Sequence, residues 1–355
     1  MIAAALAVPG DINTVTGGYI YDRRLLEELR AAGRGMQLVT LPDSFPFPSP
    51  QEMDAAMQAL LALPETCPVI IDGLAFGALD PARVGLIKAP IVALVHHPLA
   101  LESGLPQDVQ DHLWRTERDN LRHAAQIIVP SPHTREILSE RYDVPAARIH
   151  VALPGIDLPV PDTWDATVAP QGAPLILSVG ILHPRKGHDV LIDALALVAD
   201  QEWHAEIVGN PWEKGHYDAL QDRIRQAGLS DRINLAGRVS DEALEQLYRR
   251  ASIFALATRY EGYGIVFNEA LVHGLPIVSC RTGAVPDTVP AAAGLLVARD
   301  DATAFAGALR ALLTDQSLRT DMAEAARQAG ARLSSWGETA RIAGFALDAA
   351  MAGRT

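Results

Sequence analysis

Cysteine is scarce in this sequence. Its 355 residues include only Cys67 and Cys280, and their separation does not match the ligand spacing of a zinc site. Two cysteines so far apart need not form a disulfide, and a chain without a disulfide framework fits a reducing compartment. We therefore expect two small core residues in a cytoplasmic protein.

Several enzyme motifs are missing as well. The sequence has no Asp-x-Asp, and its 11 histidines show no His-Glu-x-x-His, so we expect no bound metal and no cofactor. It also lacks a Walker loop, a Gly-x-Ser-x-Gly nucleophile elbow and the Gly-x-Gly-x-x-Gly dinucleotide pattern. These absences argue against a P-loop nucleotidase, an α/β-hydrolase and a nicotinamide-dependent dehydrogenase.

Positive charge and long hydrophobic runs are also in short supply. With 30 Lys and Arg against 43 Asp and Glu, the formal net charge is −13, which argues against broad binding to nucleic acid or an anionic membrane. No hydrophobic run reaches the ~20 residues of a membrane-spanning helix. Residues 1–8 lack a positively charged leader and are expected to form a buried strand rather than a signal peptide. Peripheral contact with the inner membrane face stays open.

Hydrophobic residues are plentiful, at 49% of the chain, and short hydrophobic runs alternate with longer amphipathic segments. This alternation is typical of a parallel sheet covered by helices. The predicted strands lie at residues 3–8, 37–40, 68–71, 91–95, 127–129, 149–151, 175–179, 205–208, 233–235, 253–256 and 277–279.

The length of the chain favours two domains with a cleft between them. The proline-rich segment 154–161 and the polar stretch that follows it break both periodicities. We therefore predict an N-terminal Rossmann-like domain over residues 1–160 and a second one over 161–335. A helix is expected at 21–32, a last helix of the second domain at 303–329, and a C-terminal helix at 336–355 that packs on the first domain.

The most informative segment follows the predicted strand 253–256 and reads Arg259-Tyr-Glu-Gly-Tyr-Gly-Ile-Val-Phe-Asn-Glu. Its two glycines permit a tight loop, and a helix beginning at Ile265 would direct N–H groups and its positive dipole end at a phosphate. Glu261 and Glu269 suit sugar and ribose hydroxyls better than they suit phosphate. Without the rest of the segment, Glu261 would be interpreted as a turn residue and Glu269 as a surface charge on a helix.

This segment resembles the signature of the family 4 retaining glycosyltransferases, which have the GT-B fold of two Rossmann-like α/β/α domains. The match runs from Glu261, with its Gly-aromatic-Gly, to the Gly-x-Pro that ends in Pro276. The resemblance implies that Glu261 contacts the donor sugar and that Glu269 binds the ribose. It also implies that the backbone around Gly264, Ile265 and Val266 meets the donor diphosphate. Gly262 and Tyr263 are further candidates for binding the donor.

A second segment leaves the predicted strand 175–179 and reads Gly180-Ile-Leu-His-Pro-Arg-Lys-Gly. A fixed cation stabilises the charge of a departing diphosphate more than it stabilises the ground state. We expect Lys186 to have this role, with Arg185 second. Family members carry an additional Arg where this chain has Ile181. Either Arg185 takes the place of that Arg, or the helix backbone holds more of the donor phosphate.

The first domain supplies further candidates. Gly17 and Gly18 precede the predicted helix 21–32, and family members carry a similar Gly-Gly beside the donor phosphate. His96 and His97 follow the predicted strand 91–95, where side chains line the ligand crevice of parallel sheets. The resemblance implies a His in the donor-sugar pocket, and the strand alignment favours His96, with His97 as an additional candidate.

Arg238 and Val239, after the predicted strand 233–235, are candidates for the nucleobase contact. These residues together predict transfer of a hexose-type sugar from a nucleotide sugar, UDP-linked or else GDP-mannose, to an unidentified acceptor hydroxyl on a lipid, saccharide or small metabolite. The alternatives are a non-catalytic nucleotide-sugar-binding protein and a GT-B epimerase or phosphorylase. The resemblance implies retention, no metal, and the leaving diphosphate as the base.

Overall fold

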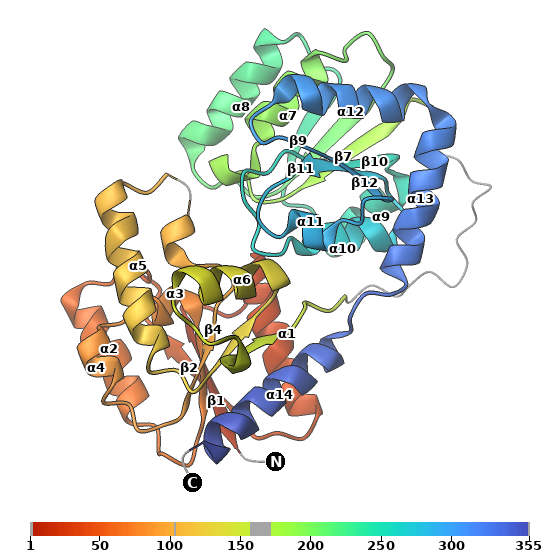
Figure 1. Cartoon of the computed structure of the whole chain (residues 1–355). Helices are drawn as coiled ribbons and strands as arrows, with labels where there is room; N and C mark the ends of the chain where they lie inside the picture. Colours follow the sequence, from red (N-terminus) through yellow and green to blue (C-terminus); the bar gives the residue numbers. More distant parts are fainter. Residues whose placement is uncertain (1–2, 103, 157–171, 354–355) are drawn as a thin grey trace. The chain divides into compact units, whose positions relative to one another are not determined.

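Hydrophobic runs of the sequence form two parallel sheets, each with helices on both faces. The computed structural model describes residues 3–102, 104–156 and 172–353, shown in Figure 1. Residues 1–157 together with 334–355 form one unit, called unit 1, and residues 158–333 form unit 2. The expected junction between residues 160 and 161 lies outside the described residues.

The sheet of unit 1 has the strand order β2-β1-β3-β4-β5-β6. All its strand pairs are parallel, and β1, β3 and β4 are buried along their whole length. Burial on both faces explains why these strands appear in the sequence as continuous hydrophobic runs. Their bounds are β1 Ala4–Pro9, β2 Met36–Leu41, β3 Val69–Asp72, β4 Ile91–Leu94, β5 Gln126–Val129 and β6 Ile149–Val151.

Helices cover both faces of this sheet (Figure 1). One face packs against α1 (Gly17–Ala31) and the C-terminal helix α14 (Trp336–Ala352). The other face shares a hydrophobic core with the remaining helices. These are α2 Pro50–Leu61, α3 Gly73–Phe76, α4 Pro81–Val84, α5 Gln107–Leu121 and α6 Pro132–Arg141, with 3-10 turns η1 Leu99–Leu101 and η2 Ala146–Arg148.

The C-terminal helix α14 is tied to unit 1 by specific contacts at its first turns. The Trp336 ring lies edge-on to Tyr21, with centroids 5.5 Å apart, and the Thr339 hydroxyl donates to the carbonyl of Leu153 at 2.6 Å. Gly155 passes so close that a Cβ there would lie 2.1 Å from the backbone nitrogen of Trp336. The end of the chain is therefore part of the first Rossmann-like unit.

The sheet of unit 2 has the order β12-β11-β10-β7-β8-β9, again with parallel pairs. Because β7 and β10 are neighbours at its centre, the loops that leave their carboxyl ends lie side by side. The strands are β7 Leu175–Val179, β8 His204–Val208, β9 Ile233–Gly237, β10 Ile253–Leu256, β11 Ile277–Cys280 and β12 Gly294–Val297.

The helices of unit 2 contribute to two hydrophobic cores, one on each face of the sheet. One core includes residues of α7, α8 and α12, and the other includes residues of α9, α10 and α11, while α13 contributes to both. The bounds are η3 Pro184–Lys186, α7 His188–Ala196, α8 Lys214–Gln226, α9 Asp241–Arg250, α10 Ile265–Val272, α11 Val285–Thr288, α12 Ala302–Thr314 and α13 Gln316–Gly330.

The structure confirms the predicted fold class. The C-terminal helix expected at 336–355 ends at Ala352, with residues 354 and 355 outside the described part, and three larger differences concern other elements. The helix expected at 303–329 is two helices, because Asp315 is extended and its side chain caps α13 by accepting from the Leu318 N–H. The edge strand β12 was not predicted. Helix α1 begins at Gly17 rather than at Tyr21, so both glycines lie in its first turn.

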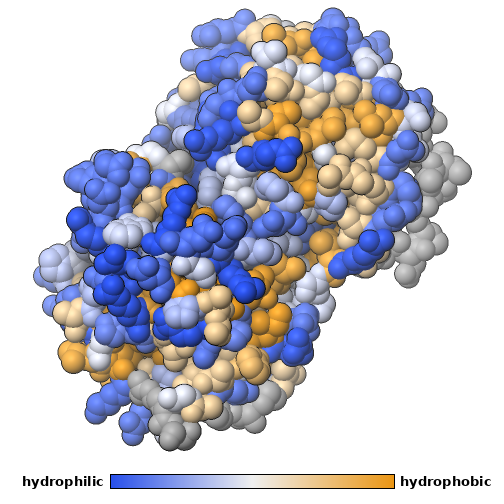
Figure 2. Space-filling model, in the orientation of Figure 1, coloured by the Kyte–Doolittle hydropathy of each residue, from blue (hydrophilic) through white to orange (hydrophobic). Residues whose placement is uncertain are grey.

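The surface is mixed in character. Figure 2 shows hydrophilic residues over the visible face of each unit, and hydrophobic patches lie among these residues. Large exposed hydrophobic side chains lie on separate elements, among them Phe47, Leu86, Trp212 and Phe345. In the part of the chain that the structure describes, every helix is too short or too polar to cross a membrane. Cys67 and Cys280 are free thiols, half-buried and buried respectively.

Candidate functional site

Lys186 and Glu261 form the centre of a polar site in unit 2. Lys186 ends the turn η3 after β7, and Glu261 lies in the loop between β10 and α10. The Lys186 Nζ donates to Oε1 of Glu261 at 2.6 Å, and the Thr258 hydroxyl donates to the same oxygen at 3.1 Å. The side chains of the pair are only 11% and 6% exposed. The adjacent strands β7 and β10 thus bring together two predicted site residues from separate motifs.

Glu261 is held as a carboxylate. Burial raises the pKa of this carboxyl group, but the charges of Lys186 and Arg185 and the hydrogen bonds from Lys186 and Thr258 outweigh it, so the pKa is below its ordinary value. A buried carboxylate with a cation beside it still offers oxygen lone pairs to a hydroxyl donor. The pair can therefore interact with an anion through Lys186 and with a hydroxyl group through Glu261.

Two glycines let the chain pack tightly around Glu261. Gly264, the N-cap of α10, has φ +89°, and a Cβ there would lie 2.6 Å from the Phe267 ring. A Cβ at Gly283 would lie 2.2 Å from the backbone oxygen of Glu261. Side chains at either position would push the loop out of place, which is the physical reason for the glycine in the Gly-aromatic-Gly pattern.

Helix α10 begins at Ile265, as predicted from the sequence. Its first turn, with Ile265 and Val266 half-buried, has the N–H groups that an α-helix does not pair internally. Glu269 lies one turn further on and accepts a hydrogen bond from the Tyr248 hydroxyl at 2.6 Å. Burial and the charge of Glu269 raise the pKa of Tyr248, so the phenol stays a donor that orients the Glu269 carboxylate.

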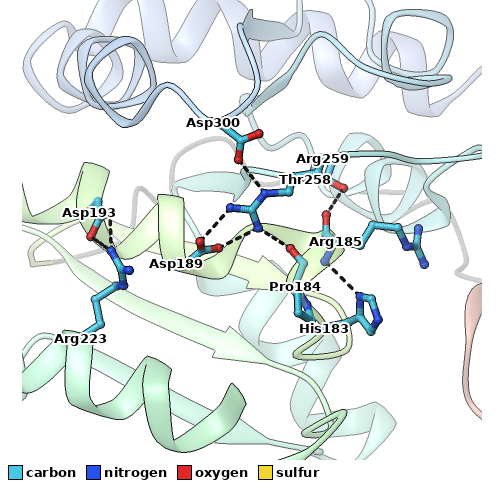
Figure 3. Close-up of polar contacts among 9 residues, drawn as sticks. All are labelled: His183, Pro184, Arg185, Asp189, Asp193, Arg223, Thr258, Arg259 and Asp300. Carbon is cyan, nitrogen blue, oxygen red and sulfur yellow. Dashed lines mark hydrogen bonds and ion pairs between the residues drawn. The ribbon is translucent and has the colours of Figure 1, made fainter. Parts of the chain in front are cut away.

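The other predicted residues of unit 2 lie around this centre. The Arg185 Nη1 donates to the carbonyl of Tyr260 at 3.2 Å. The backbone N–H of Arg185 donates to the ring of His183 at 3.0 Å, as Figure 3 shows. Gly262 and Tyr263 continue the loop, and the Tyr263 hydroxyl forms hydrogen bonds with the Asn268 side chain.

Arg238 and Val239 follow β9, two strands from β7 in the sheet. Arg238 is exposed and Val239 half-buried. Their assignment to the nucleobase stays a prediction, as do the roles assigned to the other candidates.

Unit 1 contains a second polar cluster, centred on His96 just beyond β4. The His96 Nε2 lies 3.0 Å from Oδ1 of Asp22 and 3.4 Å from Oδ2 of Asp72. Asp22 comes from α1 and Asp72 ends β3, and both are almost completely buried. The Tyr21 ring lies edge-on to the imidazole at 5.2 Å between centroids.

The charges of this cluster are coupled. Burial would lower the pKa of His96, but the charge of Asp22 and the hydrogen bonds to Asp22 and Asp72 raise it to about 10. Burial and the charge of Asp72 raise the pKa of Asp22 to about 7, against the opposing effect of His96. At neutral pH His96 is therefore an imidazolium, with both ring nitrogens protonated. In this form it can donate a hydrogen bond.

Gly18 packs against this histidine, because a Cβ there would lie 3.4 Å from the His96 ring. A Cβ at Gly17 would meet nothing within 4 Å. The additional candidate His97 is half-buried, and its Nε2 lies 3.2 Å from Glu102. The structure thus brings Gly18 and His96 together and gives His97 a different carboxylate partner.

Sequence reasoning missed Asp22, Asp72 and Tyr248. A signal was present for Asp72, because it directly follows the predicted strand 68–71 and a carboxylate at the carboxyl end of a parallel strand faces the ligand-binding edge of the sheet. Among the described residues, Asp22, Asp72 and His96 are the group whose ligand atoms, all within 4.8 Å of one another, are close enough to bind one metal ion.

Two family models match this chain. Residues 162–329 match the model described as Glycosyl transferases group 1, and residues 23–159 match the model described as Glycosyltransferase Family 4. The first match includes the Lys186–Glu261 pair, and the second includes Asp72 and His96.

Curated relatives have similar sequences. Mannosylfructose-phosphate synthase of Agrobacterium fabrum is 31% identical over 171 residues, which are 44% of this chain and 38% of that protein. D-inositol 3-phosphate glycosyltransferase of Corynebacterium glutamicum is 31% identical over 277 residues, 74% of this chain and 66% of that protein. The chain thus spans about 38–66% of the length of these two relatives.

Solved structures are similar over nearly the whole chain. Sucrose-phosphate synthase from Thermosynechococcus elongatus has a TM-score of 0.78 at 20% identity, with 96% of this chain and 98% of that chain covered. Anabaena HepE in complex with UDP and glucose has a TM-score of 0.77 at 16% identity, with 98% and 100% covered. At these identities the likeness concerns the fold, and it confirms the expected GT-B fold.

Proposed function

Because this chain belongs to the family 4 glycosyltransferases, with a second half that matches the group 1 model, we propose that it transfers a hexose-type sugar from a nucleoside diphosphate sugar to an acceptor hydroxyl, with retention of anomeric configuration. A UDP-sugar is the favoured donor, and GDP-mannose is the alternative. The observation that carries the proposal is the buried Lys186–Glu261 pair, with 2.6 Å between Nζ and Oε1.

In this proposal Lys186 stabilises the departing diphosphate. Negative charge accumulates on the diphosphate as the bond to the sugar breaks, so a fixed ammonium group stabilises the transition state more than the bound donor. The N-terminus of α10, from Gly264 to Val266, adds backbone N–H groups and the positive end of the helix dipole. Arg185, in the same turn as Lys186, adds a second positive charge.

The proposed reaction needs no protein nucleophile. The bond between the anomeric carbon and the diphosphate oxygen breaks, and a bond forms from that carbon to the acceptor oxygen on the same face. The acceptor proton passes to the departing diphosphate, and the products are a glycoside and a nucleoside diphosphate. Lys186 and α10 act by lowering the energy of the charge that develops on the leaving group.

Carboxylates recognise the sugars of the donor in this proposal. Glu261 accepts from a hydroxyl of the transferred sugar, and Glu269, oriented by Tyr248, accepts from the ribose. Arg238 and Val239 contact the base. In unit 1, the imidazolium of His96 donates to a sugar hydroxyl, and the glycines at the start of α1 bind phosphate.

We also propose that the reaction is independent of metal and takes place in the cytoplasm. The cationic side chains and helix N–H groups supply the positive charge that a divalent ion provides in other transferases. Two free cysteines fit a reducing compartment. The acceptor is an alcohol on a small metabolite, a saccharide or a lipid. Phosphorylated small acceptors are natural first trials, because the names of two relatives contain a phosphate.

A second candidate function is favoured by one residue. Ile181 stands where family members carry an Arg, so this chain could bind nucleotide sugars without transferring them. Binding of a donor with neither hydrolysis nor transfer, measured over a panel of acceptors, would support this alternative.

The proposal is tested by thermal unfolding in the presence of EDTA with UDP, GDP, ADP, their sugar conjugates and NAD. A ligand that binds the folded state raises the apparent stability by mass action. We expect a shift with UDP or GDP conjugates that is lost in Glu269→Ala and kept in Glu202→Ala, since Glu202 is an exposed residue away from this site. A shift with NAD alone, or none with any nucleotide, would contradict the proposal.

A further inference from the structure

Arg259 joins three segments of unit 2 through its guanidinium group (Figure 3). Its Nε donates to Asp300 at 2.6 Å, and its Nη1 and Nη2 donate to the two oxygens of Asp189 at 3.0 and 2.8 Å. Its Nη1 also donates to the carbonyl oxygen of Pro184. All three nitrogens of the side chain are therefore used in contacts that fix its orientation.

Two of these partners, Pro184 and Asp189, lie on either side of Lys186 in the chain. Pro184 begins η3 two residues before Lys186, and Asp189 lies three residues after it in the first turn of α7. The backbone adds to this link, because the Arg259 N–H donates to the carbonyl of Arg185 at 2.8 Å. Arg259 thus holds the segment that contains Lys186 at three points: Pro184, Arg185 and Asp189.

Arg259 is also two residues before Glu261. One residue therefore connects the Lys186 segment to the Glu261 segment, in addition to the direct contact of Lys186 with Glu261. The hydroxyl of Thr282 donates to the Arg259 carbonyl at 2.9 Å and holds the Glu261 segment in turn.

The geometry of the Asp189 contact is suited to positioning. Both side chains are about three-quarters buried, with 24% and 28% exposed, and the contact is bidentate, which fixes orientation as well as distance. Burial raises the pKa of the Asp189 carboxyl group, but the hydrogen bond and charge of Arg259 outweigh this effect and lower it. Asp189 therefore stays ionised, and the contact persists over the neutral pH range.

We propose that Arg259 is a positioning residue for the reaction: it fixes the Lys186 ammonium group relative to Glu261, so that Lys186 meets the charge that develops on the leaving diphosphate. This inference rests on the proposed function, since it assigns Arg259 an effect that acts through Lys186. It requires no contact between Arg259 and the donor.

Arg223 offers a matched control. It pairs with Asp193, which lies on the same helix α7 as Asp189, and its Nη1 donates to both carboxylate oxygens at 2.6 Å (Figure 3). Arg223→Gln therefore removes an Arg–Asp pair between α8 and α7 that, among the described residues, includes no hydrogen bond or ion pair to the Lys186 segment. A general loss of helix anchoring would appear in both Arg variants.

The experiment compares Arg259→Gln, Arg259→Lys, Arg223→Gln, Lys186→Ala and the double variant of Arg259→Gln with Lys186→Ala. The assay is turnover of UDP-glucose or GDP-mannose, whichever the wild type uses faster, including hydrolysis of the donor. Thermal unfolding of each variant is measured alongside. A displacement of about 1 Å in a catalytic group typically costs about a hundredfold in rate.

We expect Arg259→Gln to lower kcat by about tenfold or more while the donor KM changes much less. Arg223→Gln should stay within about twofold of the wild type. In the Lys186→Ala background, Arg259→Gln should have little further effect on kcat, because the group that it positions is gone. Arg259→Lys should have a higher kcat than Arg259→Gln, because it keeps the positive charge. Its kcat should stay below that of the wild type, because a single ammonium group cannot reproduce the bidentate contact.

Equal losses of kcat from Arg259→Gln in the two backgrounds, or equal losses from the two Arg variants, would overturn the inference. If Arg259→Gln does not fold, Asp300→Asn weakens one contact only, because the amide keeps an acceptor oxygen but loses the charge, and Asn tolerates the positive φ of 60° at that position. Its smaller loss of kcat should likewise vanish in the Lys186→Ala background. The proposed function fails separately, if Lys186→Ala turns over donor at the wild-type rate or the wild type turns over none.

Discussion

Gly187 lies directly against the carbonyl group of Ala257: a Cβ at Gly187 would be 1.9 Å from that oxygen. Gly187 also has φ +66°, and it is both the C-cap of η3, the turn that ends in Lys186, and the N-cap of α7. Ala257 directly follows β10. The backbones of the Lys186 and Glu261 segments can therefore approach closely only with glycine at this position.

Gly187→Ala should accordingly lower the free energy of unfolding by about 2–5 kcal/mol, from the left-handed backbone and the steric overlap together. Gly215→Ala is the control, because a Cβ at Gly215 in α8 would meet nothing within 4 Å. Urea unfolding of both variants measures the difference. If Gly187→Ala had the same free energy of unfolding as the wild type, the Lys186 segment could move away from Ala257 without loss of stability.

The Lys186–Glu261 contact leads to a second prediction. Lys186→Ala should lower kcat for donor turnover by about a hundredfold or more, as loss of one group that stabilises a transition-state charge does elsewhere. The donor KM should change less, because this charge develops only as the bond breaks. Lys214→Ala is the control, since Lys214 is a lysine of unit 2 that is 86% exposed. A change in KM alone would instead assign Lys186 to ground-state binding.

Much of the fold could be predicted because strands buried on both faces appear as hydrophobic runs that need no tertiary information. The edge strand Gly294–Val297 escaped prediction because only Gly294 of its four residues is buried and the run is short. The break at Asp315 was missed because one N-cap residue between two helical patterns changes neither pattern.

The two motifs around Lys186 and Glu261 could be predicted separately, but their contact could not. The residues are 75 positions apart, and only the sheet order, with β7 beside β10, brings them together. Asp22 was missed for a different reason. A single carboxylate in an amphipathic helix looks like a surface charge until the position of His96 shows that it is buried and paired.

The His96 cluster leads to a prediction about pH. His96 has a folded-state pKa of about 10 against 6.5 for an ordinary histidine, so the folded state binds more protons than the unfolded state between these values. Its stabilising contribution is complete below about pH 6.5 and is lost as the pH rises toward 10. Urea unfolding at pH 6.5, 8 and 9.5 should show this loss.

Asp22→Asn should reduce that dependence, because an amide cannot supply the charge that holds the His96 proton. The variant should therefore lose less stability than the wild type between pH 6.5 and 9.5. If the free energy of unfolding fell equally with pH in the variant and the wild type over this range, Asp22 would not set the charge of His96.

His188 should have the opposite effect on the acid side. This side chain is completely buried in the first turn of α7, and burial together with the charge of Lys186 lowers its pKa from 6.5 to about 3. Between these values the unfolded chain binds a proton that the folded state excludes. The contribution of His188 to stability is therefore present above about pH 6.5 and is lost as the pH falls toward 3.

His188→Leu removes this titration. At pH 8 the substitution changes the core shape but also removes two buried ring nitrogens that have no hydrogen-bond partner among the described residues, so we expect the variant to lie within about 1–3 kcal/mol of the wild type. The stability of the variant relative to the wild type should rise steadily between pH 6 and pH 4, because only the wild type must then keep a proton off a buried ring. A difference that stays constant over this range would mean that His188 is protonated in the folded protein, with a partner that accepts its charge.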